Sequence, residues 1–109
     1  MSTLTLPEPI AAYFVADQQS PDAVAHCFTK HGVVKDEGHT YAGPDAIKAW
    51  KASAAAKYDY TSEPFAVVQR DGAYVITSRV TGTFPGSPVD LQYSFRLERG
   101  LIASLEITV

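Results

Sequence analysis

The second half of the sequence alternates apolar and polar residues with a period of two, and this pattern limits the possible folds more than any other feature. Between residues 89 and 98 the apolar positions are Val89, Leu91, Tyr93, Phe95 and Leu97. A period of two places these side chains on one face of a β-strand and the intervening polar residues on the other. Comparable segments occupy residues 60–70, 73–84, 88–98 and 101–109.

Short turn sequences separate these four segments. Asp71-Gly72 favours a two-residue type I′ hairpin turn, which requires positive φ at both residues. Phe84-Pro85-Gly86-Ser87-Pro88 predicts a longer turn, and Arg99-Gly100 predicts a third short one. The four segments are therefore expected to form an antiparallel meander with one face available for packing.

The first half has helical patterning instead. The first helix is expected from Pro7 to about Gln18, with one shared face formed by Ile10, Tyr13, Phe14 and Asp17. The second begins at Ser20-Pro21-Asp22, an N-cap followed by proline and an acid, and is predicted to end near Gly32. Its predicted buried face consists of Val24, Cys27 and Phe28.

A short strand at Val33-Val34 is expected to run into the polar segment 35–39. Gly43-Pro44-Asp45 starts a third helix, whose apolar stripe contains Ile47, Trp50, Ala54 and Tyr58. Helices followed by strands in one short chain indicate an α+β fold, and we expect residues 1–109 to form a single domain.

Composition excludes several classes of partner. The net charge is −3, and the nine Lys and Arg residues are scattered, so the sequence shows no basic surface for nucleic acid or an anionic membrane. The single cysteine excludes an internal disulfide, and the three histidines lack metal-ligand spacing, so we expect no metal site. Without a signal-peptide pattern or a long apolar segment, the chain is expected to be cytoplasmic.

The two faces of the segment 73–84 differ in character. Tyr74, Ile76, Ser78, Val80 and Phe84 form the inner register; Val75, Thr77, Arg79, Thr81 and Thr83 form the outer one. The outer face is polar but rich in β-branched residues, which suits packing against another sheet. It predicts a homodimer formed through the outer sheet face.

The order of these elements resembles the SnoaL-like branch of the nuclear transport factor 2-like superfamily. That group includes polyketide cyclases, ketosteroid isomerases, dehydratases and epoxide hydrolases. The resemblance implies a cone, a cystatin-like α+β roll, in which three N-terminal helices pack on a curved, mainly antiparallel sheet. It also implies a cavity for a small hydrophobic ligand and no cofactor, with an aspartate after the first short strand acting as acid or base.

Asp36 occupies that position in this sequence. The ketosteroid isomerases also use a tyrosine from the first helix and a protonated aspartate from a late strand. Here Ala12 lies at the position of the tyrosine, with Tyr13 one residue away, and Tyr93 replaces the late aspartate. A phenol can also donate a hydrogen bond, so Tyr93 is the candidate for stabilising an oxyanion.

The candidate site combines these residues with others of inward register. A carboxylate at a strand end beside an apolar cavity would be partly desolvated and suited to proton transfer, although Asp36 could equally be a solvated loop acid. His39 could share a proton with it or lie in solvent. The predicted ligand contacts are Tyr13, Phe28, Trp50, Tyr58, Ser78 and Phe95.

These residues leave three functions open. The first is an enzyme that performs cofactor-independent acid–base chemistry as an isomerase, cyclase, dehydratase or epoxide hydrolase. The second is a binding module that holds a small ligand without changing it. The third is a homodimeric interaction protein whose sheet surface matters more than its cavity.

Overall fold

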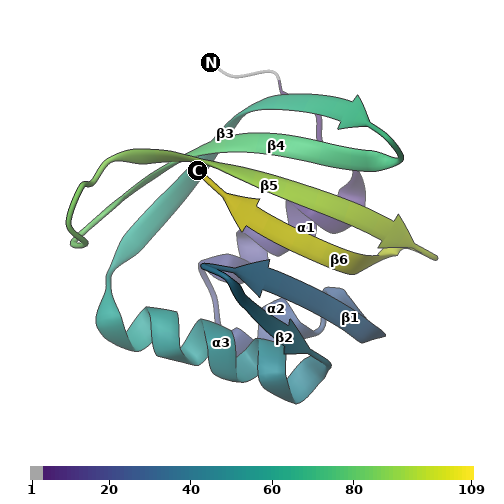
Figure 1. The fold of residues 1–109 in the computed structure, drawn as a ribbon, viewed down its shortest axis with the longest axis horizontal. Coiled ribbons are helices and arrows are strands. Elements are labelled where there is room, and N and C mark those ends of the chain that lie inside the picture. Colours follow the sequence, from purple (N-terminus) through teal and green to yellow (C-terminus); the bar gives the residue numbers. More distant parts are fainter. Residues whose placement is uncertain (1–3) are drawn as a thin grey trace.

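The computed structural model describes residues 4–109, which form three helices and one six-stranded sheet (Figure 1). The elements are α1 (Glu8–Asp17), α2 (Pro21–Ala25), β1 (Phe28–Asp36), β2 (His39–Ala42), α3 (Pro44–Lys57), β3 (Tyr60–Arg70), β4 (Ala73–Gly82), β5 (Val89–Glu98) and β6 (Leu101–Thr108). Within this part of the chain no helix is long and apolar enough to cross a bilayer.

The predicted meander is present. The strand order is β2-β1-β6-β5-β4-β3, with β3 to β6 joined as antiparallel neighbours and β1 parallel to β6. Asp71 and Gly72 have φ angles of 53° and 78°, as the predicted hairpin turn requires. The mainly antiparallel α+β architecture is confirmed.

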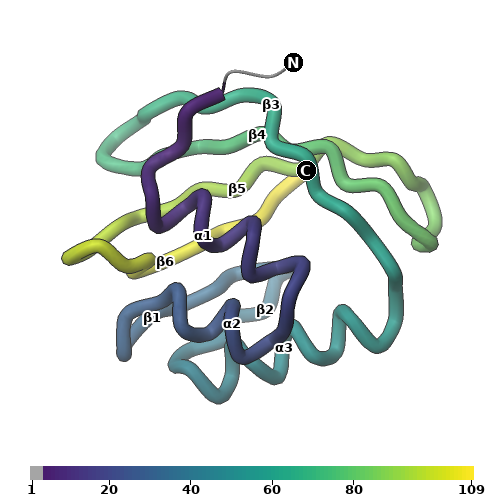
Figure 2. Tube along the Cα trace, turned by 180° about the vertical axis from the view of Figure 1, so that it is seen from behind, coloured from purple at the N-terminus to yellow at the C-terminus, as the bar shows by residue number. Residues whose placement is uncertain are grey.

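The helices cover one side of this sheet and enclose the core. Figure 2 shows α1 and α2 in front of the strands, with α3 closing the lower end. Helix α3 contacts α2, β1 and β2. The inward register of β5 is confirmed, because Tyr93 and Phe95 are buried and Gln92 and Arg96 are exposed. The buried cluster is formed by Ile10, Tyr13, Ala16, Val24, Phe28, Val34, Ile47, Trp50, Ile76, Tyr93, Phe95, Ile102 and Leu105.

The predicted extent of the second helix is wrong. Helix α2 ends at Ala25, and Phe28 begins β1 instead of lying on a helical face. The backbone N–H of Ile102 donates to the carbonyl of Cys27 at 2.9 Å, which draws the chain into the sheet beside β6. Pairing with a distant strand therefore overrides the local helical pattern.

Strand β1 is irregular where the helix was expected. Its register with β6 shifts between Phe28 and Val33. A Cβ at Gly32 would lie 2.9 Å from the Cβ of Phe28, so glycine permits this close approach. After the shift the strand runs regularly to Asp36, and the hairpin through Glu37 and Gly38 leads into β2, a strand that the sequence did not predict.

Candidate functional site

A cavity of about 430 Å³ opens between α3 and the inner face of the sheet. The apolar lining residues are Ala54, Val80, Phe84, Pro85, Val89, Leu91 and Ile107. The polar and aromatic lining residues are Asp36, Glu37, Trp50, Lys51, Tyr58, Tyr60 and Tyr93. This combination suits a small molecule with an apolar body and a few polar atoms.

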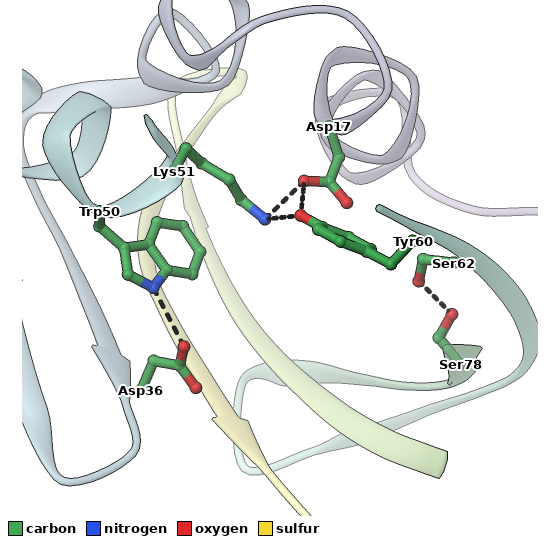
Figure 3. Close-up of polar contacts among 7 residues, drawn as sticks. All are labelled: Asp17, Asp36, Trp50, Lys51, Tyr60, Ser62 and Ser78. Carbon is green, nitrogen blue, oxygen red and sulfur yellow. Dashed lines mark hydrogen bonds and ion pairs between the residues drawn. The ribbon is translucent and has the colours of Figure 1, made fainter. Parts of the chain in front are cut away.

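Asp36 is the last residue of β1, and Trp50 from α3 fixes its carboxylate. The indole N–H of Trp50 donates to Oδ2 of Asp36 at 3.0 Å (Figure 3). Trp50 is itself buried, with Tyr41 packed 6.0 Å from it between ring centroids. The carboxylate at the cavity is therefore held by a side chain that has little freedom to move.

Three other polar side chains contact one another beside the cavity: Asp17 of α1, Lys51 of α3 and Tyr60 of β3. The Lys51 ammonium contacts Oδ1 of Asp17 at 2.5 Å and donates to the Tyr60 hydroxyl at 2.8 Å. The Tyr60 hydroxyl donates to the same Asp17 oxygen at 2.9 Å. Figure 3 shows the three groups converging from separate elements, and we refer to them as the Asp17–Lys51–Tyr60 cluster.

Burial makes this cluster unusual. The side chains of Lys51 and Asp17 are only 9% and 2% exposed. Aromatic rings surround the ammonium, whose distances to the ring centroids of Trp50, Tyr60 and Tyr13 are 4.5, 5.4 and 5.7 Å. Ion pairing, hydrogen bonding and cation–π attraction together compensate the cost of removing the charge from water.

Two tyrosines at the cavity, Tyr60 and Tyr93, have raised pKa values and stay protonated over the ordinary pH range. Burial raises the pKa of Tyr93 to about 12, with a hydrogen bond from Ser62 opposing the shift and the negative charges of Asp17 and Asp36 adding to it. Burial and the Asp17 charge also raise the pKa of Tyr60 well above its usual value. Both phenols line the cavity as potential donors of a hydrogen bond.

The structure brings together some of the predicted site residues but not all of them. Asp36, Trp50, Tyr58 and Tyr93 line the cavity. The predicted contacts that belong instead to the core behind it are Tyr13, Phe28, Ser78 and Phe95.

The core positions have separate explanations. Ser78 is fully buried and pairs with Ser62, with 2.6 Å between their hydroxyl oxygens. The fully buried Tyr13 hydroxyl has no hydrogen-bond partner among the described residues. His39 is exposed on β2 beside Tyr41 and does not line the cavity.

Sequence reasoning missed the Asp17–Lys51–Tyr60 cluster, although the signal was present. Asp17 shares the apolar face of the first helix, and Lys51 lies one turn after Ile47 on the apolar side of the third. Opposite charges on two faces expected to be buried predict an ion pair between them. In the described part of the chain, no three His, Cys, Asp or Glu residues are grouped so as to hold a metal ion.

Comparison with known proteins agrees with this architecture. The profile of the SnoaL-like domain matches residues 11–105. A proposed polyketide cyclase from Sinorhizobium meliloti is 38% identical, with a TM-score of 0.89 over 94% of this chain and 95% of that one. A comparison with curated proteins gives no match.

More distant structures share the fold. A protein from Catenulispora acidiphila with a ketosteroid isomerase-like fold, in complex with trimethylamine, is 22% identical, with a TM-score of 0.84 over 96% of this chain and 87% of that one. A protein from Cytophaga hutchinsonii, described as NTF2-like, is 12% identical, with a TM-score of 0.74 over 99% of this chain and 93% of that one. The sequence match over residues 11–105, with the 38% identical relative, shows that the chain belongs to the SnoaL-like domain family, and its fold is that of the NTF2-like protein.

Proposed function

We propose that the cavity binds a small, mostly apolar molecule and that Asp36 transfers a proton on it without a cofactor. One observation carries this proposal: a carboxylate fixed by the Trp50 indole lies at a cavity that is also lined by apolar side chains. Such a carboxylate is positioned before the ligand arrives, so little reorganisation is needed for proton transfer.

A ketone with an adjacent C–H bond fits this arrangement. Asp36 would remove the proton from carbon, and the electron pair would move onto the carbonyl oxygen as an enolate. Return of the proton to the same or another carbon would restore the carboxylate. Polyketides contain ketones beside acidic C–H bonds, and the relative from Sinorhizobium meliloti is a proposed cyclase of such compounds.

Exchange of hydrogen for deuterium tests the proposal without knowledge of the natural substrate. The probe is 2-tetralone, a small apolar ketone with exchangeable C–H bonds, followed by proton NMR in D₂O. The protein is expected to accelerate exchange above the rate in buffer, and Asp36→Asn is expected to return it to that rate. Asn keeps the size of the side chain and a carbonyl oxygen that can accept from Trp50. If exchange is as fast in Asp36→Asn as in the wild-type protein, Asp36 does not carry out the proton transfer.

The position of Tyr13 favours a second candidate function, a binding module without chemistry. Tyr13 lies in the core and not at the cavity, so it does not supply the donor that an isomerase takes from its first helix. This function predicts that 2-tetralone binds while its exchange rate stays at the buffer rate. The same NMR experiment therefore distinguishes the two candidates, once binding has been measured separately.

We also propose that two copies associate through the outer face of the sheet. Phe65 and Val68 of β3 are about half exposed there, at 50% and 51%. Val68 pairs with Val75 of β4, so their side chains lie side by side on the sheet. An apolar strip of this kind on an otherwise polar face suits a self-complementary contact.

A further inference from the structure

Lys51 is a charged residue at the cavity that has no role in the proton transfer described above. An ammonium has three N–H donors, and within residues 4–109 two acceptors contact it, the Asp17 carboxylate and the Tyr60 hydroxyl. One donor is therefore left over in a side chain that is almost completely buried and that lines the cavity. A buried N–H without an acceptor is costly, so a ligand atom that accepts from it would bind favourably.

We propose that Lys51 binds the oxygen of the ligand, and that the ligand is a neutral carbonyl compound. This inference rests on the proposed function, because it assigns a ligand to the same cavity. Lys51 is thereby a specificity-determining residue, which selects an oxygen at one end of an otherwise apolar molecule.

The positions of Asp36 and Lys51 fit a single small ligand. Both contact the indole of Trp50: Asp36 accepts from its N–H at the ring edge, and the Lys51 ammonium lies over the ring, 4.5 Å from its centroid. The two groups are thus separated by about the width of one indole, and Figure 3 shows them on different sides of it. A ketone can reach both, with its oxygen at Lys51 and its adjacent C–H bond at Asp36.

The charges favour a neutral ligand over a carboxylate. Asp17 already compensates the Lys51 charge, and the Asp36 carboxylate faces the same cavity. An anionic ligand would add a second uncompensated negative charge to the cavity, which is unfavourable. A neutral ketone adds none.

Proton transfer keeps the charge balanced during the reaction. As Asp36 takes the proton it becomes neutral, and the negative charge moves to the enolate oxygen beside Lys51. The Lys51 ammonium donates a hydrogen bond to this oxygen throughout. Such a donor is worth more to the enolate than to the ketone, because hydrogen bonds between charged groups are stronger.

The test compares two probes that differ in a single group. They are 2-tetralone and 2-methylenetetralin, in which a C=CH₂ group of similar shape replaces C=O. Binding is followed by the fluorescence of Trp50, the only tryptophan in the chain. The wild-type protein is expected to bind the ketone about tenfold or more tightly than the alkene, as a hydrogen bond from a charged donor implies.

The decisive variant is the double substitution Asp17→Asn with Lys51→Met, which removes both charges together and so avoids an unpaired buried ion. It is expected to bind the two probes with nearly equal affinity. The infrared C=O stretch of bound 2-tetralone is expected to move to higher frequency than in the wild type. Lys48→Met, at an exposed lysine of the same helix, is expected to keep the wild-type ratio and stretch.

Each outcome has a separate meaning. If the double variant keeps the wild-type preference for the ketone and the same C=O stretch, the role of Lys51 is refuted while the cavity stands. If both probes bind the wild type equally, the inference is likewise overturned. If neither probe binds the wild type, the proposed function itself fails.

Discussion

The buried ion pair of Asp17 and Lys51 leads to a quantitative prediction for Asp17→Asn. Asparagine keeps the shape of the side chain and an oxygen that can accept from Tyr60, so the substitution removes little besides the negative charge. The Lys51 ammonium then stays buried without a counter-ion. We expect a large loss of stability from a change of very few atoms.

The magnitude follows from the distance and the burial. At 2.5 Å, with an effective dielectric constant of about 20, the attraction between the two charges is roughly 7 kcal/mol. Desolvation of the two ions costs several kcal/mol each, so the intact pair contributes little net free energy. Removing one partner leaves the desolvation cost of the other, and buried pairs broken in this way lose about 3–5 kcal/mol. For a chain of this size that corresponds to a fall in Tm of roughly 12–20 °C.

Urea unfolding followed by Trp50 fluorescence, and calorimetry for Tm, measure this loss. The control is Asp22→Asn, which removes the acid of the exposed pair between Asp22 and Lys48 and is expected to change Tm much less. Asp17→Asn combined with Lys51→Met is expected to be more stable than Asp17→Asn alone. A loss below about 1 kcal/mol for Asp17→Asn, as exposed pairs show, would refute the argument.

Three further predictions concern other parts of the molecule. Because the pKa of Tyr93 is raised to about 12, the folded protein holds this proton more tightly than the unfolded chain. The Tyr93 contribution to stability is therefore complete below about pH 10 and is lost as the pH rises through 12; Tm measured from pH 9 to 12 should fall less steeply in Tyr93→Phe. Trp50→Phe removes the N–H that holds Asp36 but keeps Asp36 itself. The rate of deuterium exchange into 2-tetralone, measured by proton NMR, should fall about tenfold. Val68→Lys should convert a dimer to a monomer in light scattering, with Leu101→Lys as an exposed control outside the outer β3–β4 face; an unchanged mass would contradict the proposed interface.

The candidate site was only partly predictable, for reasons that differ between residues. Asp36 was proposed because it matches the position that the SnoaL-like resemblance assigns to an acid or base, and Tyr93 because the period of two assigns it an inward direction. Tyr13 and Phe28 were expected at the cavity from the apolar faces of predicted helices, and Phe95 from the period of two, but an inward direction does not distinguish a packed core from the wall of a cavity. That distinction depends on how far each helix lies from the sheet, which no local pattern encodes.

The sequence by itself determined the strands of the meander and their turns, because alternation and positive φ at Asp71-Gly72 are properties of neighbouring residues. Only the tertiary structure decided that the segment after Ala25 joins the sheet, since this depends on the hydrogen bond from the backbone N–H of Ile102 to the carbonyl of Cys27. Contact among Asp17, Lys51 and Tyr60 was decided in the same way. Asp17 on α1 is more than thirty residues from Lys51 and Tyr60, and it is the packing of α1 and α3 against the sheet that brings the charges and the hydroxyl together.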